Sequence, residues 1–513
     1  MKIWKIRHAG GIRGTIAGVL FLLMTGMSGC ALGSSGESGT QTPQEQTQNQ
    51  TQDSPDRTDS DEMPVTEGTA HSDANSQEPE SPAAESAGNT AASDGSEEIE
   101  EKEQFEEFGV IFETTHDIVY CTADLVNLRS APSYDGDVLR QAEKGEEFVR
   151  TGKGEGEWDR IEDGSGNLYY AASRYLSRYN PLEAEGFTWD LNDLQTVSTA
   201  RQIYDYEEMV SDLKELEEAY PEHLSVSSLG TTVDGRDIFL AVLGNPDASG
   251  AIIVQAAIHA REYMTVLLTM KQLEYYLYYY DTGYYNGIPY SEIFEHTAVY
   301  VIPMLNPDGV TISQKGLEGI RSEAVREEIL SWYERDSRNG VTSYSLSDYL
   351  KYFKANANGV DLNRNFDMGW EEFVGSAEPG AEKYKGEAPG SEKESAALIE
   401  LTDLVLPHAV ISYHATGSIL YWDYGQTGEF REECESLTKL ISGITGYQMI
   451  YKENDGGVDA AGYSDWAAGV RGIPAVTIEI GTGRAPLSIE EFPAVWDRNR
   501  EVIAAVAARY MEE

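Results

Sequence analysis

Between residues 196 and 513, runs of apolar residues alternate with segments of helical length. The apolar runs are continuous rather than interrupted at every second position, which is typical of strands that are buried on both faces. They read DIFLAVLG, AIIVQAAIH, AVYVIPML, HAVISYH and PAVTIEIG. Helices are expected at 204–220, 262–280 and 495–510, and a polar insertion with a helical pattern at 316–348. The alternation predicts an α/β domain in which helices cover both faces of one sheet.

The first 30 residues have the pattern of an export signal. Four basic residues precede the apolar run GTIAGVLFLLMTGMSG, which is too short and too rich in glycine for a comfortable transmembrane helix. The run ends in MSGC, at 27–30, which resembles a bacterial lipobox. The resemblance implies a lipoprotein signal peptide at 1–29 and a lipid on Cys30, so that the exported protein is anchored to the cell membrane, facing the extracellular or periplasmic side. Ordinary cleavage and release is the alternative, because Leu is usual where Met27 stands.

Residues 30–108 form an acidic segment with almost no aliphatic or aromatic side chains before position 105. Such a composition cannot bury enough apolar area to offset chain entropy, so we expect a disordered, extended linker. Between positions 31 and 110 there are 20 acidic and 2 basic residues, a large part of the net charge of −50. Acidity on this scale argues against a nucleic acid as partner, because the phosphate backbone would be repelled.

The segment 109–180 contains short alternating strands separated by Gly and Asp turns, which predicts a small β-barrel. The phrase VNLRSAP at 126–132, followed by Gly145, Trp158 and the Tyr175-Leu176 pair, resembles a bacterial SH3-type domain. That resemblance implies contact with cell-wall peptide; a spacer that only positions the next domain is the alternative.

Only Cys121 and Cys434 follow Cys30, and they fall in different predicted domains. A disulfide between them is therefore not expected, and both are interpreted as buried free thiols.

Three side chains of the α/β domain have the chemistry of a metal site. His259 ends the apolar run AIIVQAAIH, Glu262 follows it three positions later, and His414 ends the run HAVISYH. Three-residue spacing places His259 and Glu262 on one side of a helical turn, and the carboxyl ends of the strands bring all three together. Zinc suits such mixed nitrogen and oxygen ligands and keeps a position open for water.

Polar residues elsewhere in the domain supply the other groups of a hydrolase. Glu479 lies in the otherwise apolar run VTIEIG, where a buried carboxylate is costly unless it has a role such as accepting a proton. Asn363 and Arg364 are adjacent, and an amide next to a guanidinium can hold a carboxylate. Asp361 is placed to orient a ligating imidazole.

The motifs HARE, NPDG, GVDLNRNF, SYHATG and TIEIG, in this order, resemble the carboxypeptidase A-like zinc metallocarboxypeptidases. The resemblance spans about positions 200 to 513. It implies a mixed, twisted sheet of eight strands flanked by helices, and one zinc ion per chain. It also implies the following roles: zinc ligation by His259, Glu262 and His414, general base catalysis by Glu479, orientation of the first histidine by Asp361, and substrate binding by Arg261, Asn363 and Arg364.

Two positions depart from the family's pattern. An Arg that polarises the scissile carbonyl is usual in the family, and here the nearest match is Lys354, which would act as a point charge. The tyrosine that caps bound substrate has no clear counterpart; Tyr451 and Tyr463 are the two possibilities. Ser464 matches the floor of the specificity pocket, which leaves the side-chain preference open.

The sequence thus predicts a zinc peptidase that acts near a free carboxylate terminus. Relatives with wall-binding modules include enzymes that cut between D-glutamate and the diamino acid of peptidoglycan stem peptides, and this is the favoured substrate. A lipid-anchored carboxypeptidase for nutrient peptides is the first alternative. A non-catalytic wall-binding lipoprotein is the second, and the complete set of three ligands plus Glu479 weighs against it.

Overall fold

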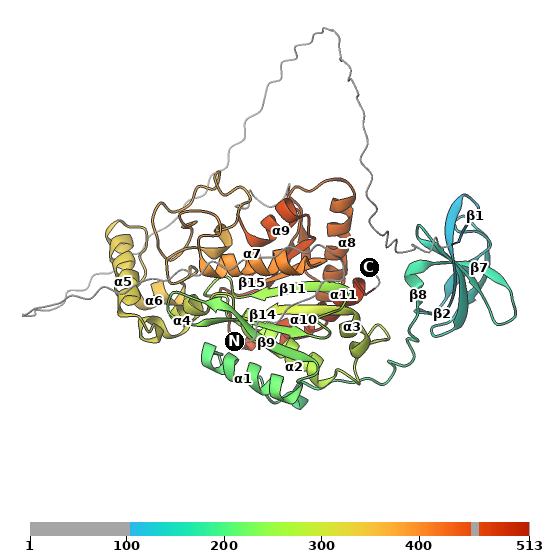
Figure 1. Ribbon diagram of the computed structural model, residues 1–513, viewed down its shortest axis with the longest axis horizontal. Helices are drawn as coiled ribbons and strands as arrows, with labels where there is room; N and C mark the ends of the chain where they lie inside the picture. Colours follow the sequence, from blue (N-terminus) through green and yellow to red (C-terminus); the bar gives the residue numbers. More distant parts are fainter. Residues whose placement is uncertain (1–102, 453–460, 512–513) are drawn as a thin grey trace, which may run out of the picture. The chain divides into compact units, whose positions relative to one another are not determined.

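The computed structural model describes residues 103–452 and 461–511 (Figure 1). The predicted signal peptide, Cys30 and the linker up to residue 102 lie outside the described residues. Within them, no helix is both long enough and apolar enough to cross a membrane. The described residues contain a β-rich segment, 104–177, and a larger α/β domain, and each is treated separately below.

The β-rich segment, called the β-module here, is an antiparallel sheet in the order β1-β2-β5-β6-β7-β3-β4, with β8 paired to β2. Its first strand starts before the predicted boundary at 109, because Phe105 stacks on Phe112 with ring centroids 5.4 Å apart. Cys121 is buried in its core. The strands are β1 (Gln104–Glu107), β2 (Val110–Cys121), β3 (Val126–Arg129), β4 (Val138–Ala142), β5 (Glu147–Gly154), β6 (Trp158–Glu162), β7 (Leu168–Ala172) and β8 (Leu176–Ser177).

The α/β domain is built on an eight-stranded mixed sheet, which confirms the predicted fold class. The strand order is β17-β16-β18-β15-β11-β14-β10-β9. The four neighbours β18, β15, β11 and β14 run parallel, while β9, β10 and β16 pair antiparallel. The strands are β9 (Leu224–Thr231), β10 (Asp237–Leu243), β11 (Gly250–Ala256), β14 (Thr297–Ile302), β15 (Ala409–Ala415), β16 (Ile419–Tyr421), β17 (Gln448–Ile450) and β18 (Ala475–Ile480).

Helices cover both faces of this sheet, as expected for strands that are apolar throughout (Figure 1). One hydrophobic cluster contains side chains of α1 (Tyr206–Ala219), α2 (Met264–Tyr278), α3 (Tyr290–His296), α8 (Gly428–Thr445), α10 (Phe492–Asn499) and α11 (Val502–Arg509). A second cluster, on the other face, contains those of α7 (Lys393–Val405) and α9 (Tyr463–Arg471). A short hairpin of β12 (Tyr284–Tyr285) and β13 (Ile288–Pro289) lies between α2 and α3.

The prediction of a single closing helix at 495–510 is wrong. The structure has two helices, α10 and α11, with a break at residues 500 and 501. Buried polar groups of α2 satisfy the backbone at this break. Gln272 donates to the carbonyl of Asn499 at 2.7 Å, and Tyr276 bonds both the carbonyl of Arg500 and the amide of Ala504. These side-chain partners replace the helical hydrogen bonds that a continuous helix would make.

The predicted polar insertion folds into helices with a hydrophobic cluster of their own. It follows α4 (Pro307–Lys315) and contains η3 (Gly316–Gly319), α5 (Glu323–Arg338) and the start of α6 (Leu346–Lys351). Ile329 and Trp332 of α5 pack with Tyr349, Leu350 and Phe353. The insertion is therefore an ordered part of the domain rather than a loose loop.

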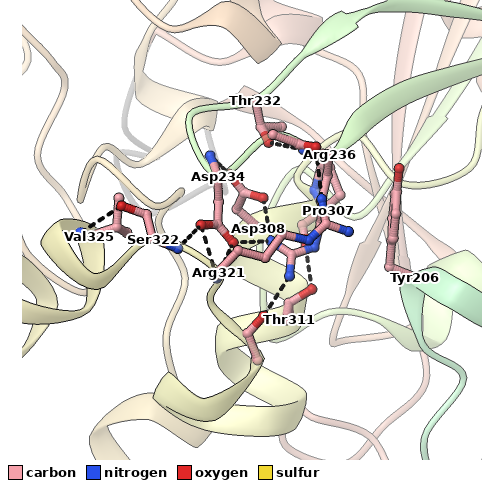
Figure 2. Close-up of polar contacts among 12 residues, drawn as sticks. Tyr206, Thr232, Asp234, Arg236, Pro307, Asp308, Thr311, Arg321, Ser322 and Val325 are labelled. Carbon is pink, nitrogen blue, oxygen red and sulfur yellow. Dashed lines mark hydrogen bonds and ion pairs between the residues drawn. The ribbon is translucent and has the colours of Figure 1, made fainter.

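A buried guanidinium ties the start of the insertion to the sheet (Figure 2). Nη1 of Arg236 donates to Asp234 at 2.5 Å and to Asp308 at 2.8 Å. The carboxylate of Asp234 in turn accepts the backbone amides of Arg321 and Ser322. All three charged side chains are almost completely buried. One arginine thus links the β9–β10 turn, the first turn of α4 and the segment that precedes α5.

Candidate metal centre and active site

The chain reverses immediately after β11, and this turn carries His259 and Glu262. Ala257 has a φ of 52°, and the amide of Glu262 donates to the carbonyl of His259 at 3.1 Å. Helix α2 begins at Met264, so both side chains lie in the turn that precedes it. The turn predicted to carry His259 and Glu262 is present, but it precedes helix α2 instead of being part of it. Because this turn follows a central parallel strand, it lies at the edge of the sheet where the carboxyl ends of the strands meet.

His259, Glu262 and His414 come together as one buried cluster. Each offers a ligand atom, and these atoms lie within 4.8 Å of one another. Nδ1 of His414 is 3.1 Å from Oε2 of Glu262, and that same oxygen accepts the amide of Ala415 at 3.1 Å. Two imidazoles and a carboxylate at this spacing fit a zinc ion, because they supply three ligands and leave a fourth position for water or substrate.

Asp361 lies next to the first histidine. Its Oδ1 is 3.4 Å from Nδ1 of His259, and its side chain is 1% exposed. Burial and the nearby positive charge of Lys354 hold the pKa of His259 well below its usual value. The imidazole is therefore neutral at pH 7, which is the form that binds metal ions.

Glu479 is next to this cluster because of the sheet register. It is the partner of His414 in the parallel pairing of β15 with β18. Desolvation raises the pKa of Glu479 to about 7. A carboxylate with a pKa near neutrality can both accept and return a proton, which is what a general base and acid requires.

Two neighbouring cavities share His259, Lys354 and Glu479 in their linings. The first, about 350 Å³ and called the Arg484 cavity here, also contains Arg261, Glu262, Thr416 and Arg484. The second, about 310 Å³ and called the Arg364 cavity, also contains Asn363, Arg364, His414 and Asp465. A backbone hydrogen bond holds Lys354 next to both cavities: its carbonyl accepts the amide of Ala260, in the turn after β11, at 3.1 Å.

Three of the residues predicted to bind substrate, Arg261, Asn363 and Arg364, line these cavities. Asn363 accepts the amide of Tyr463 at 3.0 Å through its side-chain oxygen, which fixes the short helix η4 (Leu362–Arg364) against α9. Nη1 of Arg364 donates to the carbonyl of Asn363 at 2.6 Å. Arg261 donates to the carbonyl of Tyr352 at 3.1 Å and lies 3.3 Å from Glu382.

Ser464 lies behind the cavity wall rather than in it. Its hydroxyl donates to Ser412 at 3.0 Å and accepts from Thr477 at 2.9 Å. Thr477, unlike Ser464, is among the residues that line the Arg364 cavity. The neighbouring residue Asp465, which no motif in the sequence indicates, does line it. Burial raises the pKa of Asp465 to about 6. The only signal in the sequence was a carboxylate directly after Ser464.

Neither tyrosine proposed from the sequence as a cap lines the Arg484 or Arg364 cavity. Tyr463 is completely buried, bonds Thr402 at 2.8 Å and packs against Phe366, so it belongs to the core. The hydroxyl of Tyr451 donates to Glu435 at 3.2 Å. The segment between these two tyrosines, 453–460, lies outside the described residues.

Comparison with known proteins finds relatives for the α/β domain. The chain is 31% identical over 299 residues to a gamma-D-glutamyl-L-diamino acid endopeptidase of Lysinibacillus sphaericus, covering 58% of this chain and 70% of that protein. It is 25% identical over 241 residues to the human mast cell carboxypeptidase A, covering 46% of this chain and 50% of that protein. The structure of bovine thrombin-activatable fibrinolysis inhibitor, in complex with a tick carboxypeptidase inhibitor, is 17% identical, with a TM-score of 0.46, covering 60% of this chain and 97% of that one.

A model of a protein family gives the assignment. The family described as zinc carboxypeptidase matches residues 209–502, which is more than half of the chain and includes every residue of the cluster and of the two cavities. The chain is therefore a member of the zinc carboxypeptidase family.

Proposed function

We propose that this protein is a zinc-dependent peptidase of the cell envelope that hydrolyses the bond between D-glutamate and the diamino acid of peptidoglycan stem peptides. Membership of the zinc carboxypeptidase family supports peptide hydrolysis. The 31% identity to a gamma-D-glutamyl-L-diamino acid endopeptidase, over 70% of that protein, supports the finer substrate.

The observation that carries the proposal is the mixed charge of the Arg364 cavity, which adjoins the metal cluster. Arg364 and the buried carboxyl group of Asp465 both line it. A diamino acid offers a carboxylate and a second amine, so a pocket for this residue needs a cation and an anion. Arg364 suits the carboxylate, and Asp465 suits the ammonium group. A pocket for a neutral apolar residue would need neither charge.

The residues around the cluster have separate roles in the proposed mechanism. His259, Glu262 and His414 would hold the zinc ion, which would supply Lewis-acid chemistry beside the scissile carbonyl. Glu479 takes the proton of the attacking water and delivers it to the leaving amine. Lys354 holds a positive charge beside the carbonyl oxygen, where negative charge develops.

The two cavities give the substrate a direction. If Asn363 and Arg364 hold the carboxylate of the leaving residue, that residue occupies the Arg364 cavity. The scissile bond then lies over His259, Lys354 and Glu479, which both cavities share. The acyl side of the substrate extends into the Arg484 cavity. In this orientation Arg261 contacts the peptide upstream of the scissile bond.

The proposal extends to the N-terminal parts of the chain. Export and a lipid on Cys30, which lies outside the described residues, would hold the enzyme at the membrane facing the wall. The β-module, which we interpret as an SH3-type domain, would bind cell-wall peptide. Pulldown of purified peptidoglycan by the β-module and metabolic labelling with a fatty acid, with Cys30→Ala as control, test these two steps.

Product analysis tests the proposed reaction. The purified protein is incubated with peptidoglycan stem peptides freed of their sugars and with ordinary peptides that have a free C-terminus. Each reaction is run with and without a chelator, and the products are identified by mass. We expect cleavage between D-glutamate and the diamino acid, and loss of this cleavage with the chelator. Cleavage of the ordinary peptides alone would indicate a carboxypeptidase for nutrient peptides instead. No cleavage of either would indicate a non-catalytic wall-binding protein.

A further inference from the structure

The helical insertion forms a third cavity directly beside the active site. This insertion cavity has a volume of about 800 Å³ and is lined by residues of α5, of the segments around α6 and of the 374–383 loop. It shares two lining residues, Arg261 and Arg484, with the Arg484 cavity. The two arginines therefore stand where the insertion cavity meets the space next to Glu479.

Arg484 is held in place by tyrosines near the end of the insertion. Its guanidinium lies over the ring of Tyr352, 3.8 Å from the centroid, and donates to the hydroxyl of Tyr344 at 2.6 Å. Stacking on an aromatic face restricts a long side chain without neutralising its charge. Arg484 is five positions after Glu479, in the loop that follows β18. The insertion and the strand of the general base thus position one guanidinium together.

The guanidinium of Arg484 has no carboxylate in direct contact, although Asp348 attracts it from a greater distance. In the described ranges, 103–452 and 461–511, no Asp or Glu oxygen lies within 4.0 Å of its nitrogens, whereas Arg261 is 3.3 Å from Glu382. Arg335, which also lines the insertion cavity, is paired with Asp336 and Glu378. The chain has 88 acidic and 38 basic residues, so carboxylates are abundant. A positioned guanidinium with no directly paired carboxylate, beside a catalytic site, is suited to an anion of the substrate.

We propose that Arg484 binds a carboxylate on the acyl side of the scissile bond, namely the free α-carboxylate of a γ-linked glutamyl residue. A γ-glutamyl bond uses the side-chain carboxyl group of glutamate, so the α-carboxylate remains charged close to the scissile carbonyl. An ordinary peptide bond leaves no main-chain carboxylate at that position. The inference rests on the proposed function, because it assigns the acyl side of the substrate to the Arg484 cavity.

This assignment makes Arg484 a specificity residue for γ-linked substrates, with Tyr344 and Tyr352 as its positioning residues. Arg261 is less suited to the same task, because Glu382 already faces its guanidinium. Lys383 lines the insertion cavity but not the Arg484 cavity, so its charge lies outside the space assigned to the scissile bond. Lys383 therefore offers a matched control.

A pair of substrates that differ at one group tests the proposal. The zinc-loaded full chain is given a γ-D-glutamyl-L-lysine peptide with a free α-carboxylate, and the same peptide with an α-carboxamide. The ratio of the two kcat/KM values is measured for the wild type, Arg484→Gln, Arg484→Lys, Tyr344→Phe and Lys383→Gln. Dissociation constants for both peptides are measured by calorimetry in the inactive Glu479→Gln background, so that binding is read separately from chemistry.

We expect the wild type to prefer the free carboxylate by about 10- to 100-fold, the usual worth of one charge-assisted hydrogen bond. In Arg484→Gln the ratio falls to near one, in Arg484→Lys and Tyr344→Phe it falls part of the way, and in Lys383→Gln it stays at the wild-type value. If Arg484→Gln does not fold, as judged by circular dichroism, the ratios measured for Arg484→Lys and Tyr344→Phe decide.

The results that overturn the role of Arg484 are distinguishable from a failure of the proposed function. If γ-linked peptides are cleaved but the wild type does not discriminate, or Arg484→Gln keeps the wild-type ratio, the role of Arg484 is wrong and the wall-peptide function stands. If neither γ-linked peptide is cleaved while an ordinary peptide is, the proposed function is wrong and the inference falls with it.

Discussion

Glu479 and His414 are direct register partners on two neighbouring parallel strands, β18 and β15. Partners in register point to the same face of a sheet, so the hydrogen bonds of the sheet itself set the position of the base relative to the metal ligand. Neither side chain depends on a loop for its placement. A site built on rigid central strands holds its geometry better than one built on loops.

The metal cluster predicts a simple response to loss of one ligand. His414→Ala should lower the affinity for zinc and abolish peptide hydrolysis, because two remaining ligands do not hold the ion. Zinc content after dialysis against a weak chelator measures this directly. His408→Ala is the control, since His408 is bonded to the backbone of Ala251 and lies outside the cluster. Full zinc content in His414→Ala would contradict the ligand assignment.

The Arg364 cavity predicts a loss that depends on the leaving residue. Arg364→Gln should reduce kcat/KM by about 10- to 100-fold for a substrate whose leaving residue has a free carboxylate, because one charge-assisted hydrogen bond is lost. The loss should be much smaller when that carboxylate is amidated. Arg471→Gln serves as the control for charge, because Arg471 is paired with Asp403 and lines neither catalytic cavity. Equal losses for both substrates would speak against carboxylate binding by Arg364.

The buried arginine that ties the insertion to the sheet should dominate local stability. Arg236→Met leaves the carboxylates of Asp234 and Asp308 buried without their cation, and removal of one partner of a buried ion pair costs about 3–5 kcal/mol. Thermal unfolding followed by circular dichroism measures the loss. Replacing both aspartates by Asn in the same variant should restore part of it. An Arg236→Met protein as stable as the wild type would show that the cluster is not a stabilising link.

Glu394 predicts a pH dependence of stability. Burial raises its pKa to about 8 from a reference of 4.5, with Asp308 and Glu392 adding repulsion. Between pH 4.5 and pH 8 the folded state therefore keeps a proton on Glu394 that the unfolded state has released. The contribution of this group to the free energy of unfolding is fully present below pH 4.5 and is lost as the pH rises through 8. Glu394→Gln removes this dependence.

The comparison of Glu394→Gln with the wild type isolates that one group. The variant should gain stability relative to the wild type from pH 5 to pH 8, by an amount on the order of 2–4 kcal/mol. Unfolding midpoints at both pH values measure the difference, and effects of other titrating groups cancel. A difference that does not change with pH would mean that Glu394 is not the group that takes up the proton.

The main features of the fold could be predicted from the sequence because they depend on pattern. Continuous apolar runs give central strands, and a two-faced sheet follows from them. The cluster of His259, Glu262 and His414 could be predicted because each residue follows or ends such a strand, and parallel strands place their ends together. Local pattern and global fold agree at these positions.

What could not be predicted depends on contacts between distant segments. The break between α10 and α11 is made by Gln272 and Tyr276, more than 220 positions earlier in the chain. Whether Ser464 or Asp465 faces the cavity depends on the orientation of the first turn of α9, which Asn363 fixes through the amide of Tyr463. The role of the insertion was also hidden, because its helical pattern does not reveal that Tyr344 and Tyr352 hold Arg484.

The most direct test of the account measures zinc content and stem-peptide hydrolysis on one preparation of Glu479→Gln. The account predicts one zinc ion per chain, as in the wild type, and a kcat lower by about 10²- to 10⁴-fold, because the ligands are intact and only the proton acceptor is lost. Near-normal hydrolysis in this variant, or loss of zinc together with activity, would contradict the assignment of Glu479 as a base beside a metal centre formed by His259, Glu262 and His414.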